Sequence, residues 1–269
     1  MEINLGFAIL LTALAGLSTG IGSTIAFFIR QPKYSYLSFL LGISAGVMVY
    51  ISFTELLGTA IADVGFLQSN IAFFIGIAAF AAIDILIPHS YEEESAGDAR
   101  FGTDKGAAGP GSSTAAPLSS LKRGGIFIAI GIAIHNFPEG MITFASAATG
   151  DVSLGIMIAV AVAIHNIPEG IAVSVPIFYA TGNRRQAFAY SFLSGVAEPV
   201  GALIGYAFLL PFLTPTVLST TLAAVAGIMV YISFDEILPM AHRYGREHLV
   251  ILGVVAGMGV MAFSLWLLG

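Results

Sequence analysis

The sequence contains no cysteine, a single tryptophan and few charged residues for its length of 269. Without cysteine there is no disulfide, no thiolate metal site and no cysteine nucleophile, so any bound metal must be held by nitrogen and oxygen. Charged residues make up 10% of the chain and hydrophobic residues 57%, whereas ordinary soluble domains are about 25% charged. The composition therefore indicates a protein of the lipid bilayer and gives no basic surface for nucleic acid.

The apolar residues form eight stretches that are long enough to cross a bilayer, which takes about 20 residues. We therefore predict an all-α integral membrane protein with eight transmembrane helices in a single transmembrane domain, residues 1–269. The predicted spans are residues 5–29, 36–58, 66–88, 124–148, 152–179, 186–210, 216–240 and 248–268. Residues 90–123, between spans three and four, are rich in Gly, Ser, Ala and charge, which predicts a flexible loop.

The basic residues all follow odd-numbered spans, so all ten lie on one side of the membrane. They are Arg30, Lys33, Arg100, Lys105, Lys122, Arg123, Arg184, Arg185, Arg243 and Arg246. Positively charged residues near span ends favour the cytoplasmic side. We therefore expect both termini outside and the loop 90–123 in the cytoplasm.

Two segments repeat within the chain. Residues 45–57, AGVMVYISFTELL, and residues 226–238, AGIMVYISFDEIL, agree at ten of thirteen positions. They lie in spans two and seven, which run in opposite directions. Inverted repeats of this kind are typical of secondary transporters, whose substrate site lies near the bilayer midplane. We therefore predict a 3+2+3 plan, in which spans 1–3 and 6–8 form an inverted repeat around spans four and five.

A second repeat places ionisable residues inside the central spans, as HNFPEG at 135–140 and HNIPEG at 165–170. His135 and Glu139 are four residues apart, as are His165 and Glu169, so each pair shares one helix face. His135 precedes and His165 follows the turn at Gly150 by fifteen residues, which is about 22 Å along each helix. The two motifs are therefore predicted to lie at the same depth in the bilayer.

The surroundings of these pairs favour a metal ion. A carboxylate at mid-bilayer costs about 2.5 to 3.5 kcal/mol on insertion scales, so it needs a compensating cation. Pro138 and Pro168 each remove a backbone hydrogen bond, which predicts irregular backbone lining a cavity. Imidazole, carboxylate and amide ligands suit Zn(II), Fe(II), Co(II) or Mn(II) rather than Cu(I). Glu198 in span six adds a further buried carboxylate and a candidate second metal position.

Other acidic and histidine side chains near the span ends predict a transport route. Glu55 lies near the outer end of span two, and its repeat partner Glu236 lies near the inner end of span seven. Each side of the membrane therefore has an acidic mouth. The full set of route residues is Glu55, Asp84, His89, Asp235, Glu236 and His242. Isolated carboxylates and histidines suit a route, because a conducting site must also release its ion.

Three alternatives remain from the residues. The motifs could form two buried His–Glu hydrogen-bonded pairs without an ion, but that explains neither the duplicated prolines nor the matched depth. An intramembrane metal-dependent hydrolase would use a metal-bound water, but asparagine stands where an H-E-x-x-H motif has its general base. An exporter or a proton-coupled carrier is the third, because topology does not fix the direction of flux. We expect a transporter and not an enzyme.

The doubled hexapeptide in spans four and five of an eight-span chain resembles the ZIP (Zrt/Irt-like protein) family of divalent-metal transporters, in particular its bacterial zinc-uptake branch. The resemblance covers essentially the whole chain. It implies an inner-membrane importer of Zn(II), and of Fe(II), Mn(II), Co(II) or Cd(II), as substrates rather than prosthetic groups. It also implies a two-metal site between spans four, five and six. The implied ligands are His135, Glu139, His165 and Glu169 for one metal, and Asn136, Asn166 and Glu198 for the other, with the two motif glutamates bridging. A homodimer is left open.

Overall fold

The computed structural model describes residues 5–30, 33–86, 118–148, 152–209, 212, 214–244 and 247–268. Its main helices are α1 (Leu5–Leu17), α2 (Thr19–Ser23), α3 (Ile25–Phe28), α4 (Tyr34–Ile51), α5 (Leu57–Val64), α6 (Phe66–Leu86), α8 (Leu118–Ala147), α9 (Val152–Thr181), α10 (Arg184–Ile204), α11 (Pro215–Ile232), α12 (Leu238–Arg243) and α13 (Glu247–Leu268). Three π-helical turns join or extend them: η1 (Ser52–Leu56), η2 (Gly205–Leu209) and η4 (Ser233–Ile237). His89 and most of the predicted loop lie outside the described residues.

Eight helical segments of the described chain are long and apolar enough to cross a membrane, which confirms the all-α, eight-span prediction. Two boundaries differ from those predicted by more than three residues. Helix α8 begins at Leu118, so residues 118–123 of the predicted loop are helical, and span two continues through α5 to Val64. Both extensions contain polar residues. The bilayer limits the apolar length of a span, whereas the helix itself can continue into the interface.

The first span is divided into α1, α2 and α3 at Ser18 and Thr24. The side chain of Ser18 donates to the carbonyl of Ala15 at 2.6 Å, and that of Thr24 donates to the carbonyl of Ile21 at 2.6 Å. Such local hydroxyl-to-backbone bonds compete with the helical hydrogen bonds. The regular helix is therefore interrupted at these two points, while the amides of Ser18 and Thr24 still donate to carbonyls three and four residues earlier.

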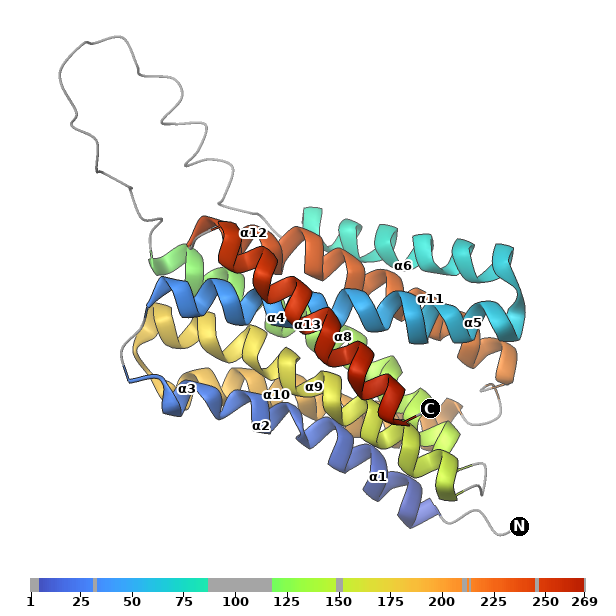
Figure 1. The fold of residues 1–269 in the computed structure, drawn as a ribbon. Helices are drawn as coiled ribbons and strands as arrows, with labels where there is room; N and C mark the ends of the chain where they lie inside the picture. The colour runs from blue at the N-terminus through green and yellow to red at the C-terminus, as the bar shows by residue number, and fades with distance from the viewer. Residues whose placement is uncertain are drawn as a thin grey trace, which may run out of the picture.

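The helices form two groups (Figure 1). The motif bundle contains α1–α3, α8, α9 and α10, which pack on one another. The flanking bundle contains α4–α5, α6, α11–α12 and α13, in which α4 packs on α13 and α6 packs on α11. The bundles meet where α4 contacts α9 and where α11 contacts α8. The two repeated hexapeptides therefore lie on neighbouring helices inside one bundle.

The inverted repeat is visible in the flanking bundle as matching helix crossings. A Cβ atom added to Gly46 would meet the backbone of Val254, and one added to Gly227 would meet the backbone of Phe73. Gly46 and Gly227 hold the same position in the two repeated segments. Phe73 and Val254 are as far apart along the chain as Gly46 and Gly227 are, so they are also counterparts. Span two therefore crosses span eight as span seven crosses span three, which confirms the 3+2+3 plan. Glycine at each crossing lets the two backbones approach closely.

The repeated segments also share a π-helical turn. It covers Ser52–Leu56 in span two and Ser233–Ile237 in span seven. In both turns the leading serine donates to the carbonyl one helical turn earlier, from Ser52 to Met48 at 2.6 Å and from Ser233 to Met229 at 2.8 Å. Single π turns often mark functional sites in helices. Here they contain the route residues Glu55 and Glu236.

The prediction of irregular backbone at the motif prolines was wrong. Helices α8 and α9 continue as α-helix through Pro138 and Pro168. A proline inside a helix removes one donor, the one that would bond the carbonyl four residues earlier, without ending the helix here. At Pro168 the carbonyl accepts a hydrogen bond from Ser44 of α4 at 2.7 Å. The proline in α9 is therefore a point of contact between the two bundles.

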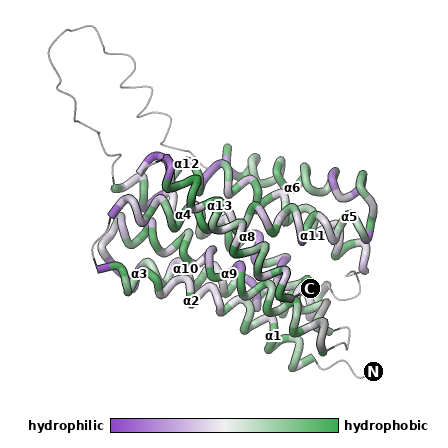
Figure 2. Tube along the Cα trace, in the orientation of Figure 1, coloured by the Kyte–Doolittle hydropathy of each residue, from purple (hydrophilic) through white to green (hydrophobic). Residues whose placement is uncertain are grey.

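The described basic residues lie at one end of the molecule. They are Arg30 and Lys33 at the α3–α4 junction, Lys122 and Arg123 at the start of α8, Arg184 and Arg185 at the start of α10, and Arg243 at the end of α12. In Figure 1 these helix ends lie together, opposite the start of α1 and the end of α13. Figure 2 shows hydrophilic residues gathered around α12 at that end, with mostly hydrophobic helices elsewhere.

Candidate metal centre

The two motifs meet by crossed hydrogen bonds between α8 and α9. His135 Nε2 lies 2.9 Å from Glu169 Oε1, and His165 Nε2 lies 2.6 Å from Glu139 Oε1. Each histidine therefore pairs with the glutamate of the other helix. All four side chains belong to residues that are at most 3% exposed. The shared face and matched depth predicted from the spacing bring these residues together, although the pairing is between motifs rather than within each motif.

The second nitrogen of each imidazole, Nδ1, also forms a hydrogen bond. His135 Nδ1 donates to the carbonyl of Gly131 and His165 Nδ1 donates to that of Ala161, both at 3.1 Å. A backbone carbonyl in this place fixes the tautomer and the orientation of a metal-binding histidine. Both Nε2 atoms are therefore directed into the space between the helices.

The motif asparagines connect this centre to the neighbouring helices. Asn166 Nδ2 donates to Glu198 Oε2 at 2.7 Å and to the carbonyl of Ala15 at 2.9 Å. Asn136 Nδ2 donates to the carbonyl of Ser194 at 3.3 Å. Through these bonds α10 supplies the carboxylate of Glu198 and the first span forms one wall. All seven residues predicted for the metal site are therefore buried, in four separate hydrogen-bonded groups on α8, α9 and α10.

Five of these seven residues have an oxygen atom without a hydrogen-bond partner. Within the described residues these are Asn136 Oδ1, Glu139 Oε2, Asn166 Oδ1, Glu169 Oε2 and Glu198 Oε1. An unpartnered buried polar atom costs about 1 to 3 kcal/mol, and more for a charged group. Five of them on the two motifs and Glu198 require an explanation that ion-free His–Glu pairs do not provide. A bound cation provides one, because it is coordinated by lone pairs of this kind.

Ligand atoms of three residues already lie close enough to share one ion. A nitrogen of His135 and carboxylate oxygens of Glu139 and Glu169 lie within 4.8 Å of one another. Imidazole nitrogen and carboxylate oxygen, without thiolate, form the donor set expected for Zn(II) and similar divalent metals. The residues present therefore fit a divalent transition metal.

The route residues divide into a cluster and isolated positions. Oxygens of Asp84, Asp235 and Glu236 lie within 4.8 Å of one another. Tyr231 donates to Asp84 Oδ2 at 3.0 Å. Glu55 is exposed in η1 and lies apart from this cluster. A further acidic side chain that sequence analysis did not select, Asp63 at the same end as Glu55, accepts a hydrogen bond from Ser219 at 2.6 Å.

The remaining predicted route residues are the histidines. His242 is exposed in the last turn of α12, where its Nδ1 donates to the carbonyl of Leu238 at 2.8 Å. It is not among the ligand atoms of the acidic cluster. His89 lies outside the described residues, so its place beside Asp84 stays a prediction.

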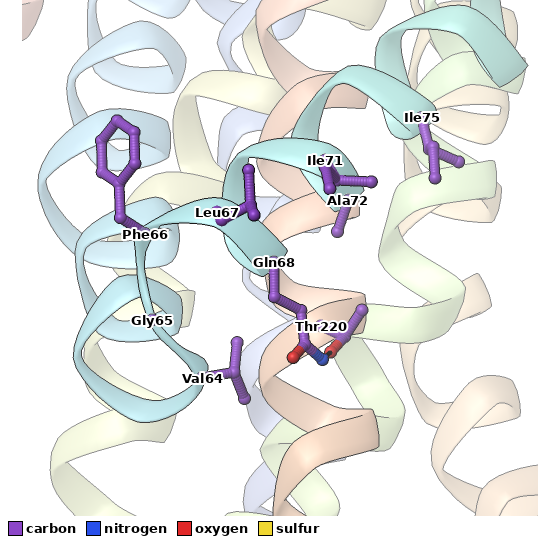
Figure 3. Close-up of a pocket in the computed structure, with 9 residues that line it drawn as sticks. All are labelled: Val64, Gly65, Phe66, Leu67, Gln68, Ile71, Ala72, Ile75 and Thr220. Atoms are coloured by element: carbon purple, nitrogen blue, oxygen red, sulfur yellow. Dashed lines mark hydrogen bonds between the residues drawn. The ribbon is translucent and has the colours of Figure 1, made fainter.

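Two surface pockets of the described chain are separate from the metal centre. Figure 3 shows one of about 530 Å³, at the turn between α5 and α6, where Gln68 Nε2 donates to Thr220 Oγ1 at 3.0 Å. Its other lining residues carry no titratable side chain. Gly65 makes the turn with a φ of 86°, which a residue with a Cβ rarely adopts. The second pocket, of about 570 Å³, lies beside Arg30 and Lys33 at the opposite end.

Sequence reasoning missed the contribution of the first span. Ser18 Oγ donates to the carbonyl of Ala163 at 2.9 Å, and the carbonyl of Ala15 accepts from Asn166. The only signal in the sequence is the small-residue stretch GLSTGIGS at 16–23, because small residues let transmembrane helices pack closely. That stretch predicts a contact but does not identify the partner helix.

Known proteins resemble this chain over nearly its whole length. Residues 87–265 match the sequence profile of the ZIP zinc transporter family. The chain is 52% identical to the zinc transporter ZupT of Nitratidesulfovibrio vulgaris strain Hildenborough, over 98% of both chains. It is 53% identical to the ZupT of Akkermansia muciniphila, over 95% of both, and 50% identical to the ZupT of Clostridium perfringens strain 13, over 98% of this chain and 96% of that one. The repeated motifs and the similarity to these proteins lead to the same conclusion: the chain belongs to the ZIP family of zinc transporters.

Proposed function

We propose that this protein imports divalent transition metals, Zn(II) first, across the bacterial inner membrane into the cytoplasm. The observation that carries the proposal is the set of five buried, unpartnered oxygens beside two oriented histidines. The names of the relatives support zinc as the substrate. Fe(II), Mn(II), Co(II) and Cd(II) are further proposed substrates, because the nitrogen and oxygen donors do not select one ion of this class.

The proposed centre is binuclear. One metal is held by His135, Glu139, His165 and Glu169, and its neighbour by Asn136, Asn166 and Glu198, with the motif glutamates bridging. The free oxygens support this division, since each motif glutamate has one oxygen paired with a histidine and one without a partner. Two ions would therefore use every unpartnered amide and carboxylate oxygen of the centre.

The proposed route enters past Glu55 and leaves past the cluster of Asp84, Asp235 and Glu236. Three carboxylates within 4.8 Å can bind a divalent ion, and no imidazole is among their ligand atoms. An ion held by few ligands is released more easily than one held by the full centre. We place His89 and His242 at the same cytoplasmic mouth.

The cytoplasmic side is assigned from charge. The described basic residues lie at the end of the molecule that contains α12, and cytoplasmic ends carry the excess of Lys and Arg. This orientation puts Glu55 outside and the acidic cluster inside. It also puts both termini outside and the loop 90–123 in the cytoplasm.

The chain is not an enzyme, because its family and its named relatives are transporters. The hydrolase alternative is therefore not favoured. Export remains the alternative direction of flux. A homodimer is compatible with the exposed apolar side chains of the outer helix faces, which lipid covers equally well.

Zinc uptake into proteoliposomes tests the proposal. The purified protein should accumulate radioactive zinc, and His135→Ala and Glu169→Ala should each lower the rate about tenfold or more, because each removes a ligand and leaves its crossed partner unpaired. The matched controls are His248→Ala and Glu247→Gln, which change exposed residues at the start of α13 and should leave uptake unchanged.

Two results would contradict the proposal. Undiminished zinc uptake in both His135→Ala and Glu169→Ala would exclude the centre as the transport site. Zinc efflux from loaded vesicles whose protein is inserted in the cellular orientation, without uptake under an inward gradient, would identify an exporter.

A further inference from the structure

The two halves of the motif bundle are related by matching contacts. A Cβ atom at Gly22 would meet the carbonyl of Ile167, and one at Gly201 would meet the carbonyl of Phe137. Phe137 and Ile167 hold the same position in the two hexapeptides. Span one therefore contacts span five as span six contacts span four, and Gly22 is the counterpart of Gly201.

The same relation pairs Thr19 with Glu198. A Cβ atom at Gly170 would meet the carbonyl of Thr19, and one at Gly140 would meet the carbonyl of Glu198. Gly140 and Gly170 are the last residues of the two hexapeptides, and Thr19 precedes Gly22 by the same interval as Glu198 precedes Gly201. Thr19 thus stands in the first span where the metal-site glutamate stands in the sixth.

The motif asparagines follow this symmetry. Asn166 donates to the carbonyl of Ala15, and Asn136 donates to that of Ser194. Ala15 precedes Thr19 by the same interval as Ser194 precedes Glu198, so the two accepting carbonyls are counterparts. Asn166 also donates to Glu198. By the same relation, the side chain that corresponds to Glu198 on the Asn136 side is that of Thr19.

The hydroxyl of Thr19 has the features of an unused ligand. Thr19 is 0% exposed, and its Oγ1 has no hydrogen-bond partner. A Cβ atom at Gly195 would lie 2.8 Å from this oxygen, next to Ser194, which anchors Asn136. Asn136 Oδ1 is also without a partner. Two neutral, unpartnered oxygens therefore belong to side chains that contact the same turn of α10.

We propose that Thr19 Oγ1 joins Asn136 Oδ1 as a neutral ligand on one side of the second metal position, opposite the acidic side formed by Asn166 and Glu198. Thr19 is then a specificity-determining residue that sets how weakly an ion is held on its side. The inference rests on the proposed metal transport and goes beyond it. A hydroxyl attracts a divalent cation far less than a carboxylate does. An ion with neutral oxygen ligands on one side exchanges more readily than one surrounded by carboxylates, which favours release, and neutral oxygen ligands favour Mn(II) over Zn(II) relative to imidazole.

Metal binding to the purified full chain tests the proposal. Zinc and manganese isotherms are recorded by calorimetry for the unmodified protein, Thr19→Val, Thr19→Ser and Thr19→Asp. Thr19→Val keeps the volume but removes the hydroxyl, and should weaken the looser of two zinc ions about tenfold while leaving the tighter one unchanged. Thr19→Ser keeps a hydroxyl and should bind the looser zinc ion as the unmodified protein does. Thr19→Asp should tighten the looser ion and slow zinc release from proteoliposomes. Ser174→Ala, which removes another buried hydroxyl without a partner, is the control and should change nothing.

The outcomes separate this inference from the proposed function. An unchanged looser ion in Thr19→Val, an equal loss in Thr19→Ser and Thr19→Val, or only one zinc ion in the unmodified protein would each overturn the role of Thr19. Absence of zinc binding and uptake in the unmodified protein would instead overturn the proposed function. If Thr19→Asp does not fold, the comparison of Thr19→Val with Thr19→Ser still shows whether the hydroxyl at this position binds the looser ion.

Discussion

Each histidine of the centre has a fixed nitrogen and an exchangeable one. The bond from Nδ1 to a carbonyl of its own helix, Gly131 for His135 and Ala161 for His165, is local and does not involve the ion. The bond from Nε2 joins a glutamate that would itself be a ligand. In the proposed centre, metal binding would replace one bond of each imidazole and keep the other, so the rings would need no reorientation.

Replacing the two motif asparagines by alanine should lower the stability of the protein by different amounts. In metal-free protein, Asn166→Ala removes two hydrogen bonds and leaves both oxygens of Glu198 without a hydrogen-bond partner, whereas Asn136→Ala removes one bond of 3.3 Å. We expect Asn166→Ala to lower the free energy of unfolding by about 1 to 3 kcal/mol and Asn136→Ala by less. Thermal unfolding in detergent with excess chelator measures the difference. Equal midpoints for the two variants would show that the bond between Asn166 and Glu198 contributes nothing.

The composition of the centre could be predicted at this scale, but its pairing could not. Spacing of four residues placed His135 with Glu139 on one face, and equal distance from the turn placed His165 beside them. Which histidine meets which glutamate depends on the rotation of α8 and α9 about their axes. That rotation is set by contacts far apart in the sequence, such as the close approach of Gly140 to Glu198.

At the scale of helices, glycine contacts determine how closely the spans of each bundle pack. The crossing of α11 with α6 at Gly227 allows no side chain, because a Cβ atom would meet the backbone of Phe73. Backbone cannot move aside as a flexible side chain can. The helices must therefore separate if the glycine is replaced.

Alanine substitutions test this contact. Gly227→Ala should destabilise the protein by about 1 to 3 kcal/mol, since overpacking displaces a backbone. Gly259→Ala is the control, because an added Cβ there has no atom within 4 Å, and alanine favours a helix over glycine. The unfolding temperature of both variants in detergent is the measurement. A Gly227→Ala protein as stable as Gly259→Ala would contradict the close crossing.

Hydropathy predicted the number of membrane spans, because crossing the lipid requires about 20 apolar residues. It could not predict η1 or η4, because the SFTEL and SFDEI segments have no period that distinguishes a π turn from an α turn. It also placed the start of span four too late. The residues from Leu118 to Arg123 are partly polar and still helical.

At the scale of the molecule, all described basic residues lie at one end, which predicts that this end faces the cytoplasm. Because the chain contains no cysteine, cysteines introduced singly can test this orientation in the membrane. A single cysteine at Thr214, before α11, should react in intact cells with a membrane-impermeant maleimide. A single cysteine at Arg185, at the opposite end, should react only after permeabilisation, because the basic end faces the cytoplasm. Both positions are exposed. The reverse pattern of labelling would invert the proposed topology and, with it, the assignment of entrance and exit.

The crossed histidine–glutamate bonds have a consequence for the empty carrier. Zinc fingers unfold when their metal is removed, because nothing else joins their ligands. Here the ligands of α8 bond those of α9 without an ion, and Asn166 ties α10 and the first span to them. Chelation would therefore leave a folded protein rather than a collapsed one. A zinc transporter has no ion in its centre between one transport event and the next, and these bonds would hold the spans of the motif bundle together during that interval.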